Sequence, residues 1–463
     1  GLSVYLLENG NLLRSGRASG SFSGGGVGGV FELYNWEGEL LWSYIMADDV
    51  RQSHHDIEPL PNGNFLALVW TELTSLETSE RGRITNQPVW MENIYEIKMK
   101  GSDDIDIVWE WKMEDHLIQE ENTNLLNYGI VADHPERMNF NFEVGTDKDW
   151  AHFNAIDYNE DLDQIAISAR SFNEIWILDH STTTEEAATS EGGESGKGGD
   201  ILYRYGNPQA YNRGTEDDQV FFSQHNIEWI DQGSFIGELS VFNNIYDLGV
   251  SRVERFIPPL QDGTYQLEEG SAYGPTEVEW AYEEEGFFSS RISGAQFLAN
   301  DNVLICQGNS GRFFEITQGG EVVWEYFNPV SGIGGPVVQG EIPFQVATFR
   351  ALKYSPDYPA LDGKDLTPGD PIEIDPIPSD CIPTITSVNA DISQGLQIDK
   401  SIVSDNIRVQ ISIASHITVM DAMGVVHKNL QLTAGEHVLD FGSFASGFYF
   451  LTDGVSTFRL FKY

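Results

Sequence analysis

Two histidines and a serine occupy one position of a repeated strand–turn–strand pattern. Each stands five residues before an apolar residue that leads into a turn rich in Asn, Asp or Gly, and the three are His55, His225 and Ser293. A third histidine, His152, falls at or beside the same position of another repeat, and the next strand of that repeat ends at Arg170. Equivalent residues of units repeated around an axis converge on that axis. The pattern therefore predicts a ring of three imidazoles and one guanidinium.

The residue types in this ring of side chains limit the ligands that it could bind. Three imidazoles could bind zinc or another divalent metal ion. Arg170 argues against a metal, because its positive charge repels a cation, and we expect none. Imidazole and guanidinium donors instead suit a tetrahedral oxyanion such as a sulfuryl or phosphoryl group. Since neighbouring residues of a strand point to opposite faces, only one of His54 and His55 should face the ring, and the repeat favours His55.

The elements that position these residues are repeated strands. Each repeat contains a hairpin, a third strand, and a fourth strand that carries two aromatic residues one residue apart. Because side chains alternate along a strand, both aromatics share one face, where we expect them to pack between units. The aromatic pairs are Trp42/Tyr44, Trp109/Trp111, Tyr203/Tyr205, Trp280/Tyr282 and Trp324/Tyr326. Four antiparallel strands repeated radially are typical of the blades of a β-propeller.

The repeats predict an all-β protein with a six-bladed β-propeller. Five repeats are complete, and Phe344–Leu352 indicates an incomplete sixth blade. Propellers commonly close by combining strands from both chain ends, so we expect the missing strands before Gly1. The chain opens directly in a strand and is interpreted as a processed or truncated form. The first strand of each blade lines the central channel, so the ring should lie at one mouth of that channel.

Three long segments interrupt the repeats. Ser181–Gly199 is rich in Thr, Ser, Glu and Gly, and we interpret it as a mobile surface loop. Its Gly196-Lys197 pair lacks the spacing of a phosphate-binding loop. Glu114–Lys148 and Asn207–Ser223 are long insertions. Long ordered loops on a propeller often cover the channel mouth, so we expect these two to act as lids.

The charge balance excludes one class of partner. The 463 residues include 26 Lys and Arg against 72 Asp and Glu, a formal net charge of −46 at pH 7. A chain this acidic does not bind nucleic acid through its phosphates. The acidity suits a soluble surface in an extracellular or salty medium. No stretch has EF-hand spacing, and the distant cysteines Cys306 and Cys381 do not indicate a compartment.

A Pro- and Asp-rich linker, 367–384, separates the predicted propeller, 1–366, from a second unit, 385–463. Short alternating strands in the second unit predict a small antiparallel β-sandwich of immunoglobulin-like type. Parts of it resemble the C-terminal sorting domain of type IX secretion cargo, namely Ile417–Gly424, Ser446–Leu451 and the terminal Arg459–Tyr463. The resemblance implies export across the outer membrane of a Bacteroidetes-type cell, with the type IX translocon and its shuttle proteins as partners. The protein is then secreted or held at the cell surface.

The ring residues stand in motifs that resemble those of bacterial arylsulfate sulfotransferases. The motifs are His54-His55-Asp56 before Leu60-Pro61-Asn62-Gly63-Asn64, His152-Phe153-Asn154 before Ser168-Ala169-Arg170, and Gln224-His225-Asn226. The resemblance covers roughly residues 1–360. It implies a six-bladed propeller that moves a sulfuryl group from an aryl sulfate to a phenolic acceptor through a sulfated histidine. It also implies that no metal, cofactor or phosphoadenosine sulfate donor takes part.

The same resemblance implies a role for each residue of the motifs. His225 would be the nucleophile. The sulfuryl oxygens would be held by His55, His152 and Arg170. The remaining motif residues would bind substrate, and these are His54, Asn154 and Asn226.

Two functions of other classes stay open. One is a non-catalytic secreted propeller whose channel mouth binds an anion. The other is a metal-dependent lyase or hydrolase on a propeller. Metal analysis separates the last from the others, and turnover of a chromogenic aryl sulfate, with and without a phenol, separates the transferase from the binding protein.

Overall fold

The computed structural model describes residues 2–376 apart from 146, 248, 333 and 342, and seven segments of the C-terminal region. Those segments are 396–398, 402–403, 406–411, 415–421, 426–444, 447–452 and 457–462. The chain divides into two compact units, Gly1–Ile377 and Pro378–Tyr463. No helix within the described residues has the length and apolar character needed to cross a membrane.

Within the described residues, the first unit contains five four-stranded antiparallel sheets. The first sheet consists of β1 (Val4–Leu6), β2 (Leu12–Arg17), β3 (Gly29–Tyr34) and β4 (Leu40–Ile45). The second consists of β5 (Arg51–Pro59), β6 (Phe65–Leu73), β7 (Val89–Lys100) and β8 (Asp104–Lys112). The third consists of β11 (Phe153–Asn159), β12 (Gln164–Ala169), β13 (Glu174–Asp179) and β14 (Tyr203–Tyr205). The fourth consists of β15 (His225–Trp229), β16 (Leu239–Asp247), β17 (Val250–Phe256) and β20 (Trp280–Tyr282), and the fifth of β21 (Gly294–Phe297), β22 (Val303–Gln307), β23 (Arg312–Ile316) and β24 (Val322–Phe327).

Shorter elements lie in the connections between these strands. The α-helices are α1 (Ser75–Glu80) and α2 (Thr184–Ala187). The two-stranded pairs are β9 (Leu117–Ile118) with β10 (Met138–Asn139), β18 (Leu260–Gln261) with β19 (Thr264–Tyr265), and β25 (Val330–Ser331) with β26 (Gly335–Pro336). The 3-10 helices are η1 (Met113–His116), η2 (Val131–Asp133), η3 (Arg170–Phe172), η4 (Pro208–Tyr211), η5 (Glu216–Asp218), η6 (Gly233–Phe235) and η7 (Pro359–Leu361).

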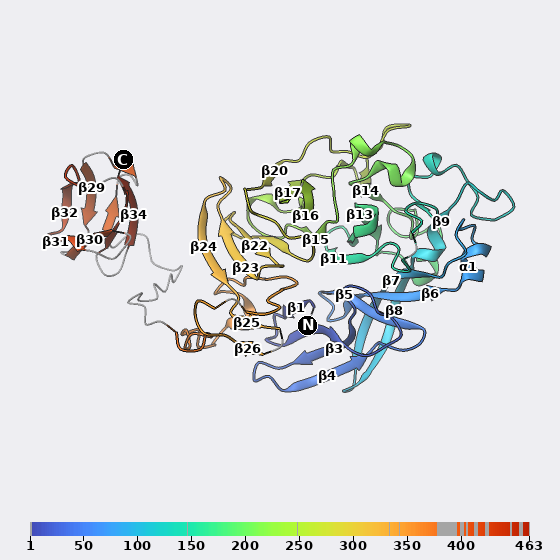
Figure 1. Cartoon of the computed structure of the whole chain (residues 1–463), viewed down its shortest axis with the longest axis horizontal. Coiled ribbons are helices and arrows are strands. Elements are labelled where there is room, and N and C mark those ends of the chain that lie inside the picture. Colours follow the sequence, from blue (N-terminus) through green and yellow to red (C-terminus); the bar gives the residue numbers. More distant parts are fainter. Residues whose placement is uncertain are drawn as a thin grey trace. The chain divides into compact units, whose positions relative to one another are not determined.

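The sheets are the blades of a β-propeller, as predicted. In Figure 1 they follow one another around a common centre, with β1, β5, β11 and β15 nearest to it. The aromatic pairs lie on the fourth strands, and those of the first four blades pack against the next blade. The ring of Trp42 meets Phe65 at 6.2 Å between centroids, and Trp280 meets Phe297 at 5.6 Å. Burial of these rings between blades is the main apolar contribution that holds neighbouring sheets together.

The predicted sixth blade is wrong for the described residues. Residues 344–352 contain no strand, and Trp324 on β24 of the fifth blade is 48% exposed because no blade covers it. The segment instead spans from the fifth blade to the first. The carbonyl oxygen of Phe349 accepts from the Ser293 amide at 3.1 Å, and Arg350 donates to the hydroxyl of Tyr5 on β1 at 2.8 Å. Because the segment has no hairpin partner, residues of both blades satisfy its polar groups.

The second unit has two sheets that share one core. One sheet has the order β27 (Leu396–Ile398), β29 (Asn406–Ile411), β32 (Gly435–Asp440). The other has the order β28 (Ile402–Val403), β34 (Thr457–Lys462), β33 (Gly447–Thr452), β30 (Ser415–Asp421), β31 (Val426–Leu432). Ile407 and Leu439 from the first sheet and Val419 and Leu451 from the second are buried in a common cluster. One pair, β28 with β34, is parallel, so the predicted wholly antiparallel arrangement is modified there.

The start of the predicted linker belongs to the first unit. Ile374 pairs with Val338 in an isolated bridge, and its amide donates to the carbonyl oxygen of Val337 at 2.9 Å. Residues 377–384 of the linker lie outside the described residues.

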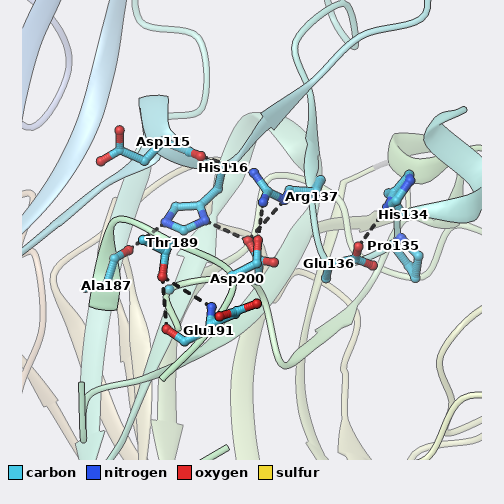
Figure 2. A network of polar contacts seen from close by, with 12 residues as sticks. Asp115, His116, His134, Pro135, Glu136, Arg137, Ala187, Thr189, Glu191 and Asp200 are labelled. Carbon is cyan, nitrogen blue, oxygen red and sulfur yellow. Dashed lines mark hydrogen bonds and ion pairs between the residues drawn. The ribbon is translucent and has the colours of Figure 1, made fainter. Parts of the chain in front are cut away.

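The loop Ser181–Gly199 is folded and tied down, contrary to the prediction of a mobile loop. It contains α2, whose first turn is closed by a capping box between Thr183 and Glu186. Figure 2 shows how it binds the insertion 113–149: the ring of His116 places Nδ1 2.8 Å from Asp200 Oδ1 and Nε2 2.8 Å from the carbonyl oxygen of Ala187. Arg137 adds a contact of 3.1 Å from its Nε to Asp200. This buried network fixes the insertion that forms one wall of the site described next.

Candidate active site

Irregular backbone marks the start of the inner strands in three blades. The strand pairing shifts between Ser53 and Ile57 in β5, between Phe153 and Ala155 in β11, and between His225 and Glu228 in β15. Positive φ angles occur at these places: 45° at His55, 54° at His152 and 53° at Asn226. Bulges and left-handed residues re-aim side chains and are common next to active sites. Strict alternation along the strands, assumed from the sequence, therefore does not hold where the histidines stand.

The structure brings the three predicted ring histidines and Arg170 together. The rings of His55 and His152 lie 4.6 Å apart between centroids. His152 is the residue before β11, whereas His55 lies within β5, and both have a positive φ beside a shift of the strand pairing. The amide of Arg170, at the start of η3, donates to the carbonyl oxygen of His152 at 3.2 Å. His225 lies close enough that the positive charge of Arg170 helps burial to lower its pKa.

A cavity of about 490 Å³ opens at this cluster. Its wall comes from the first blade, from Trp90 on β7 of the second blade, from the end of the insertion Glu114–Lys148 with the adjoining Asp149, and from the cluster itself. The lining residues are Ser23, Gly24, Gly25, Trp90, Asp147, Lys148, Asp149, His152, Arg170 and Ser171. The end of the insertion therefore borders the site, as expected of one of the two predicted lids. The cavity has the size of a small-ligand site.

A glycine-rich loop of blade 1, which the sequence analysis missed, closes over the histidines. A Cβ atom at Gly26 would lie 2.0 Å from Nε2 of His55, and the φ angle there is +70°. A Cβ atom at Gly24 would lie 3.0 Å from the Trp90 ring. Only glycine can bring the backbone this close. The run Gly20–Gly29 is the signal in the sequence that could have revealed this loop.

The hydrogen bonds of His225 fix its tautomer. Nδ1 lies 2.7 Å from Oδ1 of Asn244 and 3.1 Å from the carbonyl oxygen of Ser223. The Asn244 amide nitrogen donates to the carbonyl oxygens of Ser289 and Ile292 at 2.8 and 2.9 Å, so its Oδ1 must be the atom that faces His225. Two acceptors at Nδ1 require a proton there. The remaining nitrogen, Nε2, keeps an unprotonated lone pair.

Burial lowers the pKa of His225 to about 3, with Arg170 as the next cause. This lowered pKa could not be predicted from the sequence, because burial cannot be read from the motif. The ring is thus neutral over the whole physiological range, which is the state that a nucleophilic imidazole needs. Asn244, which holds it, was also missed by the sequence analysis, since nothing in the motif points to the neighbouring strand β16.

Arg170 and His152 present donors to the cavity. Nδ1 of His152 lies 2.6 Å from Oδ2 of Asp149, which orients the ring. The guanidinium of Arg170 has no hydrogen-bond or ion-pair partner in the part of the chain that the structure describes. Burial lowers the pKa of Arg170, and Asp149 opposes that effect. A partly buried, unpaired guanidinium is a ready partner for an anion.

The other predicted binding residues are engaged with the protein itself. The side chain of Asn154 donates to the carbonyl oxygen of Gln224 at 2.7 Å. Asn226 donates to Glu228 at 2.6 Å and accepts from the amide of Ala295 at 2.7 Å. His54 stacks on Trp70 with ring centroids 4.0 Å apart. All three are buried, so their contact with a substrate stays a prediction.

Carboxyl groups rather than imidazoles fill the channel farther along the inner strands. Burial raises the pKa of Glu58, Asp157 and Glu228, that of Glu228 to about 7. Arg350 lies among them and binds Asp56. Among the described residues, no group of three or more His, Cys, Asp or Glu is arranged to hold a metal ion.

One comparison with known proteins identifies a family. Residues 27–326 match the sequence model of the Arylsulfotransferase (ASST) family. No curated protein matches the chain.

Solved structures show only distant likenesses. A protein of unknown function from Bacteroides caccae is 14% identical over 70% of this chain and 79% of its own, with a TM-score of 0.37. Virginiamycin B lyase from Staphylococcus aureus is 12% identical over 70% of this chain and 68% of its own, with a TM-score of 0.31. The periplasmic gluconolactonase of Pseudomonas aeruginosa is 10% identical over 68% and 81%, with a TM-score of 0.34. Likenesses this weak do not bear on function.

Proposed function

Since the chain belongs to the arylsulfotransferase family, we propose that it moves a sulfuryl group from an aryl sulfate to a phenolic acceptor by way of a sulfated His225. The observation that carries the proposal is the fixed tautomer of His225. Its Nδ1–H bonds Asn244 at 2.7 Å, which leaves the Nε2 lone pair to attack sulfur. The scheme needs no phosphoadenosine sulfate donor, because the aryl sulfate itself supplies the sulfuryl group. It needs no metal ion, because Arg170 supplies positive charge at the site.

In the first half-reaction, Nε2 of His225 attacks sulfur in line with the leaving phenolate. The N–S bond forms as the S–O bond to the aryl group breaks, and the electron pair of that bond leaves on the phenolate oxygen. Arg170 and the histidines beside it stabilise the sulfuryl oxygens while the group flattens. The sulfated ring is cationic, so its Nδ1–H donates a stronger hydrogen bond to Asn244.

In the second half-reaction, a phenol takes the place of the departed aryl product. Its oxygen attacks sulfur, its proton passes to water, and the N–S electron pair returns to Nε2. His225 is again neutral and in its original tautomer. A covalent intermediate between two substrates predicts ping-pong kinetics.

Turnover of 4-nitrophenyl sulfate tests the proposal. We expect release of nitrophenolate that is faster with a phenol acceptor, and transfer of the sulfuryl group to that phenol, because the acceptor discharges the intermediate. The measurement is absorbance together with mass analysis of the sulfated product. Binding of the ester or of sulfate without turnover would support the alternative, a non-catalytic propeller with an anion site. Turnover abolished by a metal chelator would support the lyase or hydrolase instead.

We also propose that the second unit is a type IX sorting domain that directs export and has no part in catalysis. Its separate core of Ile407, Val419 and Leu451 supports independent folding. Deletion of 385–463 in a cell with a type IX translocon is expected to keep the protein inside the cell while aryl sulfate turnover per molecule is unchanged. Fractionation and the nitrophenol assay measure the two effects. Normal secretion of the shortened chain would contradict the proposal, and full-length protein in the same host is the control.

A further inference from the structure

The imidazole of His54 lies directly behind that of His55. Their Nδ1 atoms are 2.9 Å apart, and the rings meet edge to face with centroids 5.2 Å apart. Two nitrogens at this distance share one proton, because one must donate and the other accept. The tautomer of His54 therefore dictates the tautomer of His55, which stands at the candidate active site.

A buried carboxyl group extends this series of polar contacts beyond His54, on the side away from His55. Oε2 of Glu92, on β7, lies 2.9 Å from Nε2 of His54, which is within ion-pair distance. Both atoms are buried, and neither forms a hydrogen bond with any other described residue, so each is left to the other. The other oxygen of Glu92 accepts from the amide of Phe153 at 2.9 Å and from Nε1 of Trp70 at 3.4 Å. Glu92 has no exposed surface. Oε2 is therefore the oxygen that carries or releases a proton.

The surroundings favour the neutral forms of Glu92, His54 and His55. Burial, followed by the charge of Asp149, holds the pKa of Glu92 well above its usual range. Burial lowers the pKa of His54 to about 3. Burial and the neighbouring charges of His152, His54, His225 and Arg170 also lower the pKa of His55. A protonated Glu92 then donates to His54 Nε2, His54 Nδ1–H donates to His55, and His55 keeps its proton on Nε2.

We propose that Glu92 and His54 form a proton relay through which a neutral His55 protonates the leaving phenolate. The proposal rests on the sulfuryl transfer proposed above. A neutral imidazole alone is too weak an acid for this task, but the relay makes the carboxyl group the source of the proton. No described residue forms a hydrogen bond with Nε2 of His55, and this nitrogen is not one of the fully buried atoms, although Gly26 packs beside it. In the proposed relay it is the nitrogen that meets the leaving oxygen.

The relay balances in protons and charge. His55 Nε2–H passes its proton to the phenolate oxygen, and His55 Nδ1 takes the proton of His54 Nδ1. His54 Nε2 in turn takes the proton of Glu92 Oε2. Both imidazoles end neutral, and the negative charge of the phenolate is now on Glu92, where the amide of Phe153 and Nε1 of Trp70 donate to it. The same steps reverse when the acceptor phenol gives up its proton.

A series of aryl sulfates with phenols of different acidity tests the relay. Glu92→Gln keeps a donor toward His54 but cannot release its proton. We expect nearly wild-type rates with 4-nitrophenyl sulfate, whose phenolate leaves unaided, and a loss of about 10²-fold with esters of unactivated phenols. The dependence of kcat/KM on phenol pKa therefore steepens. His54→Phe keeps the stack on Trp70 and is expected to steepen the dependence of kcat/KM on phenol pKa to the same extent. The double variant with both substitutions should show no steeper dependence than either single variant.

A purely structural role for Glu92 has a different signature. Glu315→Gln alters a buried glutamate of the fifth blade and is the matched control; it is expected to leave the dependence on phenol pKa unchanged. If Glu92→Gln lowers the rates with all esters by one factor, or leaves them unchanged, the relay is wrong.

A second measurement does not depend on turnover. Nitrogen NMR of labelled histidines should show His54 with its proton on Nδ1 at neutral pH. The infrared band of a protonated carboxyl should disappear in Glu92→Gln. An ionised Glu92 at neutral pH would overturn the relay even in an active enzyme. Absence of turnover by the wild type with every ester would instead overturn the transferase itself and the role of the relay with it.

Discussion

Replacement of His225 by Asn is expected to lower sulfuryl transfer by at least about 10⁴-fold, as loss of a covalent nucleophile does in other enzymes. The amide of asparagine offers no lone pair comparable with Nε2 of the imidazole. The rate of nitrophenolate release measures the effect. His134→Asn is the matched control, because His134 is half-exposed and its ring contacts Glu136 at 2.9 Å, away from the cavity lining.

The intermediate can be observed directly. Wild-type protein mixed with donor alone and quenched rapidly at alkaline pH should yield a sulfated peptide that contains His225. Because the pKa of His225 is lowered to about 3, its protonation should not reduce the rate of this step until about pH 4. A sulfate on another residue, or full activity of His225→Asn, would show that the nucleophile is assigned wrongly.

Arg170→Ala is expected to lower kcat/KM for aryl sulfates by about 10²–10³. The guanidinium lines the cavity, and in the proposed mechanism it binds the oxygens that gain charge in the transition state. Its partial burial strengthens this interaction, since little water screens it. Arg170→Lys should recover only part of the loss, because an ammonium cannot make the paired hydrogen bonds of a guanidinium.

Steady-state kinetics separate this role from simple binding. Loss of kcat together with kcat/KM indicates an interaction made in the transition state. A rise in KM alone would restrict Arg170 to substrate binding and contradict the prediction. Arg14→Ala is the control, because Arg14 lies on β2, is partly exposed and pairs with Glu32 at 2.6 Å.

The sequence by itself determined the architecture of the blades. Aromatic residues with one residue between them, such as Trp42 and Tyr44, share one face when they lie on a strand. The structure places both on β4, and the ring of Trp42 contacts the next blade. His55 and His225 occupy matching positions of two repeats. Matching positions of different blades lie at the same height along the central channel, so the sequence indicated that these two side chains lie close together. The number of blades was not determined in this way. A single apolar run, 344–352, reads as a strand, but only a partner strand makes it one.

Only the tertiary structure decided the chemistry that each side chain can perform. The bulge in β5 puts the rings of His54 and His55 together, although alternation would separate them. Asn244 and Glu92 come from neighbouring strands, and the hydrogen bonds they offer set which nitrogen of each imidazole carries a proton. Tautomer and pKa depend on burial and on contacts between residues far apart in the chain. A local motif specifies the residue types but not these surroundings.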